Sequence, residues 1–388
     1  MQTEVLNVPR DVRRGHEAHP RYVVWELTLK CDLACRHCGS RAGRPRAEEL
    51  DLAEARDVVA QLAAAGTREV TLIGGEAYLS PHWLEITRAL TDAGIIASMT
   101  TGARGITPEL AGQAADAGMR AMSVSIDGME ATHDRLRAVP GSWKRAVTAL
   151  GTIREAGMAP HANTQWNRLN MDEAEPLAAV LRMQGVKAWQ VQVTGPMGRA
   201  SDREDWLLQP ADLLDLVPRL AAIAREGRAE GFRVEAANNL GYFGPYEQDL
   251  RRVHWQGCQA GRYVLGIESN GDVKGCPSLP SAPYVGGNLR ERSLADIWDQ
   301  TEQLRFSRDR TTDELWGFCK SCYYAETCRG GCSWTAHTLL GRRGNMPLCF
   351  HRADTLRERG IRERLVRVEA APGQPFDFGR FEIVEEAW

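Results

Sequence analysis

The stretch Cys31-Asp32-Leu33-Ala34-Cys35-Arg36-His37-Cys38 places three cysteines on one short segment, with the spacing C-x3-C-x2-C and no fourth cysteine nearby. Three thiolates can bind three irons of a cubane 4Fe–4S cluster and leave the fourth iron open, whereas four thiolates make a closed electron carrier. A zinc site completed by His37 is the alternative. Zinc prefers paired C-x2-C ligands, and the adjacent His37 and Cys38 cannot easily both reach one ion. The spacing therefore favours an open iron–sulfur site.

Outward from this segment, short apolar stretches alternate with amphipathic ones. The apolar stretches predict strands over 22–29, 69–73, 97–100, 121–125, 161–165 and 189–193. Helices are predicted over 52–65, 82–93, 108–117, 142–156, 174–184 and 211–226. Each crossover is long enough for a helix, so the strands should be parallel. Six such units predict an α/β fold with a partial (β/α)6 barrel, although composition alone fits a doubly wound sheet equally well.

The amino-acid composition changes after about residue 235, and this change indicates a domain boundary. Gly, Pro, Asn and Tyr become more frequent, and seven of the ten cysteines lie between Cys258 and Cys349. We therefore predict an N-terminal extension over 1–20, a barrel over 21–235, a loop-rich domain held by metal over 236–355 and a C-terminal tail over 356–388. The tail should contain one helix, followed over 371–388 by an extended, loosely packed end.

A second short motif, Gly74-Gly75-Glu76, follows the second predicted strand. Together with the cysteine segment after the first strand, it makes the chain resemble the radical S-adenosylmethionine (SAM) superfamily. The resemblance implies that Cys31, Cys35 and Cys38 hold a 4Fe–4S cluster whose open iron chelates SAM. Its reductive cleavage then gives methionine and a 5′-deoxyadenosyl radical.

The same resemblance implies further contacts with SAM. The glycines and Glu76 would receive the amino group of its methionine part, and His37 would pack near the adenine. The other implied cofactor-binding side chains lie near strand ends: Ser125, Asp127, Arg135, Asn163 and Gln192. Arg137 is a second candidate for the methionine carboxylate, and the stretch 195–200 resembles the adenine-side loop of the family.

The other cysteines are Cys258, Cys276, Cys319, Cys322, Cys328, Cys332 and Cys349, with the turn Ser269-Asn270-Gly271-Asp272 between the first two. The turn predicts a two-stranded β unit between Cys258 and Cys276. This spacing resembles the seven-cysteine signature of the SPASM domain, which binds auxiliary iron–sulfur clusters.

The SPASM resemblance also implies how these cysteines divide between two auxiliary clusters. Four of them, Cys319, Cys322, Cys328 and Cys349, would hold one cluster completely. The other three, Cys258, Cys276 and Cys332, would hold the second with three thiolates, because no further cysteine follows Cys258 closely. The second cluster would then have an open iron, another ligand or a smaller core. Either cluster could bind substrate, accept an electron, or serve only to hold the domain together.

Relatives of this two-domain kind mostly modify ribosomally made peptides, so we expect a crosslink or an oxidation in natural-product or cofactor maturation. The alternative is a small-molecule substrate such as a tetrapyrrole or a sugar. A non-catalytic electron carrier is a third hypothesis, which the three-cysteine loop disfavours. Pro277 and Ser278 follow Cys276 and are poor general bases, which argues against formylglycine formation; Tyr78, His82 and His161 are candidate bases elsewhere.

The expected partners follow from composition and from the resemblance. Net charge is −3, so neither nucleic acid nor a membrane surface is expected as a partner. No signal peptide or membrane span is evident, which predicts a cytoplasmic protein. The resemblance implies an electron donor such as flavodoxin or ferredoxin. About 20 residues precede the first strand, too few for a leader-binding module, so a peptide substrate would need a separate recognition protein or direct docking.

Overall fold

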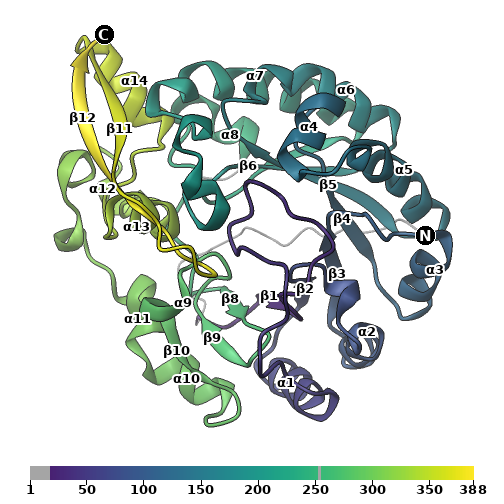
Figure 1. The fold of residues 1–388 in the computed structure, drawn as a ribbon. Helices are drawn as coiled ribbons and strands as arrows, with labels where there is room; N and C mark the ends of the chain where they lie inside the picture. The colour runs from purple at the N-terminus through teal and green to yellow at the C-terminus, as the bar shows by residue number, and fades with distance from the viewer. Residues whose placement is uncertain (1–17, 252–254) are drawn as a thin grey trace.

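A ten-stranded sheet organises the computed structural model, which describes residues 18–251 and 255–388 (Figure 1). Strands β1 to β7 are parallel neighbours in chain order. Their bounds are β1 (Tyr22–Glu26), β2 (Glu69–Ile73), β3 (Ile96–Thr101), β4 (Ala121–Ser125), β5 (Ala159–Trp166), β6 (Ala188–Val193) and β7 (Arg233–Ala236). The prediction of an α/β fold with a parallel sheet is confirmed. A seventh parallel strand, β7, adds to the six predicted.

Helices cover the outer face of this curved sheet (Figure 1). They are α1 (Leu52–Ala64), α2 (Trp83–Asp92), α3 (Pro108–Asp116), α4 (Glu130–Arg137), α5 (Ser142–Glu155), α6 (Ala174–Met183) and α7 (Leu213–Gly227). Alternate strand residues such as Val70, Leu72 and Met99 face them and are fully buried in the main apolar core. Helix α1 begins at a capping box between Asp51 and Glu54, as that local sequence favours.

The opposite set of strand residues forms what we call the inner face of β1–β7, and it is largely polar. It includes Tyr22, Glu69, Thr71, Ser98, Ser123, His161, Asn163, Gln190, Gln192 and Glu235. The residues of this set do not join the main apolar core, and Gln190 is exposed although β6 lies between two other strands. The period-2 alternation therefore separates an apolar outer layer from a polar inner one.

The C-terminal region extends the same sheet rather than starting a separate one. Strand β8 (Val264–Ile267) is parallel to β1, and β9 (Asp272–Lys274) and β10 (Val285–Asn288) follow it as antiparallel neighbours. Gly271, at φ +90°, turns the chain between β8 and β9, so the predicted two-stranded unit is present. The short helices are α8 (Glu247–Leu250), α9 (Ser281–Tyr284), α10 (Leu294–Gln300), α11 (Glu302–Asp309), α12 (Ala325–Cys328), α13 (Ser333–Leu340) and α14 (Phe350–Glu358). The predicted division at residue 235 thus falls inside β7.

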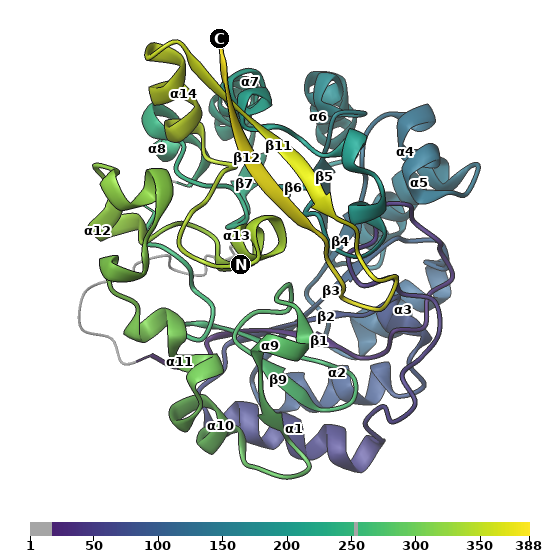
Figure 2. The same ribbon diagram turned by 60° about the vertical axis from the view of Figure 1, so that its left-hand side comes forward.

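The end of the chain is ordered, and the prediction of a loosely packed terminus is wrong. Strands β11 (Ile361–Glu369) and β12 (Arg380–Ala387) pair as an antiparallel hairpin. Leu365 and Phe381 on one face of the hairpin are buried in the main core, which explains the close packing. Figures 1 and 2 show the hairpin loop reaching the segment that follows β1. Most of the predicted N-terminal extension lies outside the described residues.

Within the two described ranges, no helix combines the length and the apolar character needed to cross a membrane.

Candidate functional site

The three cysteines of the first motif lie on the loop that follows β1. A bridge between Lys30 and Gly43 closes this loop at its base, with Gly43 N donating to Leu29 O at 2.9 Å. Cys35 is buried, and Cys31 and Cys38 are half-buried free thiols. Burial raises the pKa of the Cys31 thiol to about 12, so a cation must lie close by to keep it as the thiolate. Three free thiols on one loop fit the donor set of an iron–sulfur cluster.

The loop after β6 holds the cysteine loop in place. Arg199 N donates to Cys38 O at 2.9 Å, and its Nε donates to Cys35 O at 2.6 Å. Gly198, at φ +60°, packs so closely that a Cβ there would lie 2.3 Å from Gly39 O. Only glycine fits both this conformation and this space. The predicted adenine-side loop therefore packs directly on the three-cysteine loop, and Arg199 is a contact that the motif analysis did not single out.

A buried charge network lies behind the same loop. His37 Nε2 lies 2.9 Å from Asp127 Oδ2, and Arg137 Nη2 lies 2.6 Å from the same oxygen. Arg137 Nη1 also donates to Cys35 Sγ at 3.6 Å. Burial alone would raise the pKa of Asp127, but Arg137 and then His37 hold it well below its usual range. Asp127 is thus a permanent anion that connects the cysteine loop to the end of β4.

The Gly74-Gly75-Glu76 turn packs against the segment that leaves β1. A Cβ at Gly74 would lie 2.3 Å from Thr28 O, and one at Gly75 would lie 2.2 Å from Lys30 O. The glycines are therefore required because a neighbouring backbone packs against them. Glu76 is buried, and its carboxylate accepts hydrogen bonds from Thr101 Oγ1 at 2.7 Å and Gly102 N at 2.5 Å. Burial raises its pKa to about 7 in spite of these bonds.

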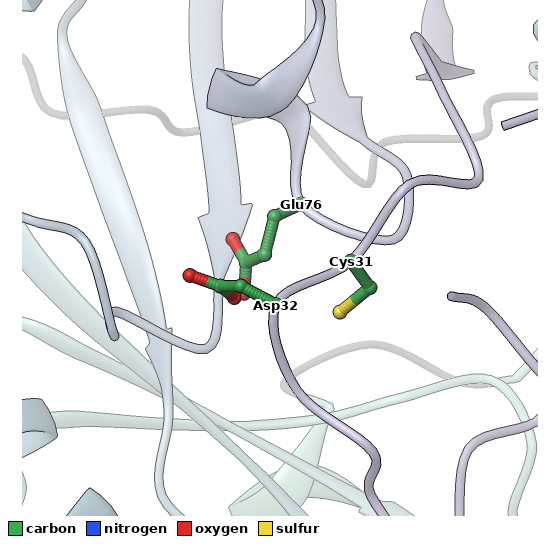
Figure 3. A group of neighbouring side chains, drawn as sticks. All are labelled: Cys31, Asp32 and Glu76. Atoms are coloured by element: carbon green, nitrogen blue, oxygen red, sulfur yellow. The ribbon is translucent and has the colours of Figure 1, made fainter. Parts of the chain in front are cut away.

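Asp32 joins Glu76 beside the first cysteine. One ligand atom each from Cys31, Asp32 and Glu76 lies within 4.8 Å of the others (Figure 3). Tyr78 Oη donates to Asp32 Oδ2 at 2.9 Å and accepts from Gly105 N at 3.0 Å. This small acidic group suits an ammonium ligand next to the open side of a cluster.

The other predicted cofactor residues divide into two sets. Ser125 and Asn163 lie opposite each other on β4 and β5, and Gln192 lies on the adjacent strand β6, so all three share the inner face. Arg135 is exposed on α4, with its guanidinium 5.4 Å from the Trp206 ring. The structure therefore places Arg135 apart from the site and its neighbour Arg137 within it.

The three candidate bases have different surroundings. Tyr78 is bonded to Asp32, and His82 is half-buried just before α2. His161 lies on the inner face, where burial lowers its pKa and Nε2 has no hydrogen-bond partner among the described residues.

The seven C-terminal cysteines form two groups. The first group consists of Cys258, Cys276 and Cys332. Cys258 and Cys276 pack beside the small apolar cluster that contains Tyr284 and Phe306. Burial, with a smaller contribution from the nearby Cys258 thiol, raises the pKa of Cys276 to about 11 and the pKa of Cys332 to about 12. The other four line one pocket: Cys319, Cys322, Cys328 and Cys349. The resemblance implies that each group holds one auxiliary cluster, and this assignment stays a prediction.

Trp334 links the surroundings of Cys258 and Cys276 to the loop after β6. It packs on the same small apolar cluster as these two cysteines, and its Nε1 donates to Met197 Sδ at 3.4 Å. A Cβ at Gly195 would lie 2.4 Å from the Trp334 ring, so glycine is required there.

Comparison with known proteins gives two family matches. Residues 25–175 match the model of the radical SAM superfamily, and residues 258–323 match that of an iron–sulfur cluster-binding domain, SPASM. The chain is 30% identical over 349 residues to the AdoMet-dependent heme synthase of Methanosarcina barkeri, covering 86% of this chain and 97% of that protein. It is 29% identical over 336 residues to the mycofactocin maturase MftC of Mycolicibacterium smegmatis, covering 85% and 83%.

A solved structure has the same fold. SuiB of Streptococcus suis bound to S-adenosylmethionine superposes with a TM-score of 0.68 at 18% identity, covering 82% of this chain and 74% of that one. Together with the cysteine loop and the two C-terminal cysteine groups, these matches establish that the chain belongs to the radical SAM superfamily, as an enzyme that carries an iron–sulfur cluster-binding SPASM domain.

Proposed function

We propose that this enzyme cleaves SAM reductively and uses the resulting radical to modify a ribosomally made peptide, through a crosslink or an oxidation. The observation that carries the proposal is the division of ten free cysteines into three spatial groups, of three, three and four. The first group lies on the loop that follows β1, and the other two lie in the C-terminal region. This is the arrangement expected of one open cluster and two auxiliary clusters.

The roles of the residues follow from their positions. Cys31, Cys35 and Cys38 would hold the cluster that binds SAM; when bound, the two supply the 5′-deoxyadenosyl radical that removes a hydrogen atom from the substrate. Glu76 and Asp32 would accept hydrogen bonds from the methionine ammonium group. Ser125, Asn163 and Gln192 offer hydroxyl and amide groups on the inner face.

His37, Asp127 and Arg137 serve mainly to position the cysteine loop in this proposal. Their bonds to one another occupy the Asp127 carboxylate oxygen that faces the loop. A cationic guanidinium beside Cys35 also stabilises the thiolate form of that ligand.

Two observations support a peptide substrate. Relatives of the chain are named mycofactocin maturase and PqqA peptide cyclase, and SuiB has been solved with its precursor peptide. The inner face of β1–β7 carries one arginine or lysine, Arg233, which is paired with Glu235 at 3.3 Å. A surface of hydroxyl, amide and carboxylate groups suits peptide groups better than a ligand with several carboxylates. A small-molecule substrate such as a tetrapyrrole remains the second candidate, because a relative at 30% identity is named a heme synthase.

The test is anaerobic reconstitution followed by an iron count and an assay for 5′-deoxyadenosine. We expect roughly twelve irons per chain if all three clusters are cubanes. Replacement of Cys31, Cys35 or Cys38 by Ala should abolish 5′-deoxyadenosine formation. Replacement of Cys322 by Ala should lower the iron count and leave SAM cleavage measurable. Cleavage that survives in the first three variants would contradict the proposal.

A further inference from the structure

A small, partly open pocket lies between the elements that the proposed reaction must bring together. One side is formed by Gly74 and by Ser40, two residues after Cys38. Another side is formed by Pro277, the residue after Cys276, and Phe376 from the loop of the C-terminal hairpin completes the wall. The pocket therefore joins the three-cysteine loop, the glycine turn and the three-cysteine auxiliary group.

The charged side chains of the pocket wall neutralise one another. Lys274 is fully buried, and its Nζ lies 2.6 Å from Glu268 Oε1 and donates to Leu279 O at 2.6 Å. Arg46 is paired with Glu26 at 2.9 Å and with Glu268 at 3.0 Å. Glu268 thus pairs with Lys274 within the wall, and both Glu26 and Glu268 pair with Arg46, which is not among the lining residues.

Apolar surface makes up the rest of the wall. Ile73 and Ile267 line the pocket from β2 and β8, and the Phe376 ring lies over it. Lys274 Nζ is 4.5 Å from the centre of this ring, and the Arg46 guanidinium is 5.3 Å from it. Cation–π contacts of this kind hold the ring over the charged pairs.

The loop that carries Phe376 is fixed on the site by its neighbour Asp377. The Asp377 carboxylate accepts from Arg41 Nε at 2.7 Å and from Gln374 N at 3.0 Å, and its carbonyl accepts from Gly198 N at 2.7 Å. Phe376 has a positive φ of +58°, a conformation that a non-glycine residue adopts only when its surroundings favour it. The hairpin loop is therefore built onto both the cysteine loop and the loop after β6.

We propose that this pocket receives an uncharged apolar or aromatic side chain of the peptide substrate, and that Phe376 determines which side chain fits. The inference rests on the proposed function and specifies its substrate. A ligand carboxylate would need a free cation, and the described pocket-lining residues offer none beyond the paired Lys274. An uncharged side chain gains contact with Ile73, Ile267 and Phe376 without disturbing the ion pairs.

Binding of small probes to the reconstituted holoenzyme tests the proposal. The probes are N-acetyl-L-tyrosinamide and, for a charged side chain, N-acetyl-L-aspartic acid amide, titrated by calorimetry. We expect saturable binding of the tyrosine probe, weakened about three- to tenfold by Phe376→Ala and less by Phe376→Leu. Trp388→Ala removes an exposed aromatic side chain from the same hairpin and is the matched control, with unchanged affinity expected.

Three results would overturn the inference: no saturable binding of the tyrosine probe to the wild-type holoenzyme, equal affinity in the wild type and both Phe376 variants, or tighter binding of the aspartate probe. The amount of 5′-deoxyadenosine formed by each protein separates this inference from the proposed function. Cleavage of SAM with no effect at Phe376 refutes the pocket alone, whereas absence of cleavage refutes the proposed function.

Discussion

Two regions of the molecule place a buried arginine–carboxylate pair behind a group of thiols, and they do so differently. Behind the three-cysteine loop, Arg137 contacts both Asp127 and the Cys35 thiol. In the four-cysteine region, Arg352 binds Glu363 through two hydrogen bonds of 2.7 and 2.6 Å and, in the part of the chain that the structure describes, donates to no thiol. The first pair therefore acts directly on a thiol that we propose as a cluster ligand, and the second connects the region to strand β11.

This difference indicates that the first pair orients the cysteine loop and that the second stabilises the fold. The Arg137 pair is shared with His37, so it orients the loop that would bind SAM. The Arg352 pair joins α14 to the hairpin whose loop reaches the Phe376 pocket, and the same guanidinium donates to Asn345 Oδ1 at 2.6 Å. Loss of the second pair should thus affect the stability of the fold more than the chemistry of a ligand.

Arg352→Met should produce the largest loss of stability. It leaves Glu363 as a buried, unpaired carboxylate, which typically costs about 3–5 kcal/mol of the free energy of unfolding. Urea unfolding followed by circular dichroism measures this loss. Arg364→Met is the matched control, because Arg364 pairs with Glu386 on the exposed face of the same hairpin and should cost less than about 1 kcal/mol. Equal losses in the two variants would contradict the role given to the buried pair.

Glu69 shows what a buried carboxylate does without an arginine. It lies on the inner face and, in the described part of the chain, accepts a hydrogen bond from Ser98 and forms no salt bridge. Burial raises its pKa from 4.5 to about 7, whereas Arg137 keeps that of Asp127 low. A raised pKa in the folded state means that Glu69 favours folding at low pH, and that stability falls as pH rises from about 4.5 to 7.

Glu69→Gln should remove this loss of stability with rising pH. The loss is about 3 kcal/mol, which corresponds to the difference between the ordinary pKa of 4.5 and the raised pKa of about 7. The free energy of unfolding of the wild type and the variant should be compared at pH 5 and pH 8. We expect the free energy of unfolding of the variant, relative to that of the wild type, to be higher at pH 8 than at pH 5. Parallel pH dependence in the two proteins would show that Glu69 titrates normally.

The sequence predicts the repeated units and the cysteine groups because both depend on local patterns. The strands β2 to β6 follow period-2 apolar stretches, and each cysteine spacing is read within a short segment. The strand β7 escapes prediction because it has only four residues. The hairpin β11–β12 escapes prediction because charged residues such as Arg362, Glu363 and Arg364 obscure the alternation of apolar and polar side chains. The Arg137–Asp127–His37 network joins the cysteine loop to residues about 90 to 100 positions later in the chain, and Arg199 reaches the same loop from about 160 residues away. Only the fold creates such contacts.

Arg137→Lys should have the smallest effect on stability and the most specific effect on the site. Lysine keeps the charge beside Asp127, but its single ammonium group cannot span both the carboxylate and the Cys35 thiol, so we expect a loss of about 1–2 kcal/mol. The electron paramagnetic resonance signal of the SAM-binding cluster should change on addition of SAM differently from that of the wild type, while the auxiliary signals stay the same. Arg135→Lys is the matched variant, since Arg135 lies two residues earlier on the same helix and is exposed. The opposite result, in which Arg135→Lys alters the SAM-dependent signal and Arg137→Lys does not, would assign the methionine carboxylate of SAM to the exposed Arg135. The buried Arg137–Asp127 pair would then only support the fold, as the Arg352–Glu363 pair does.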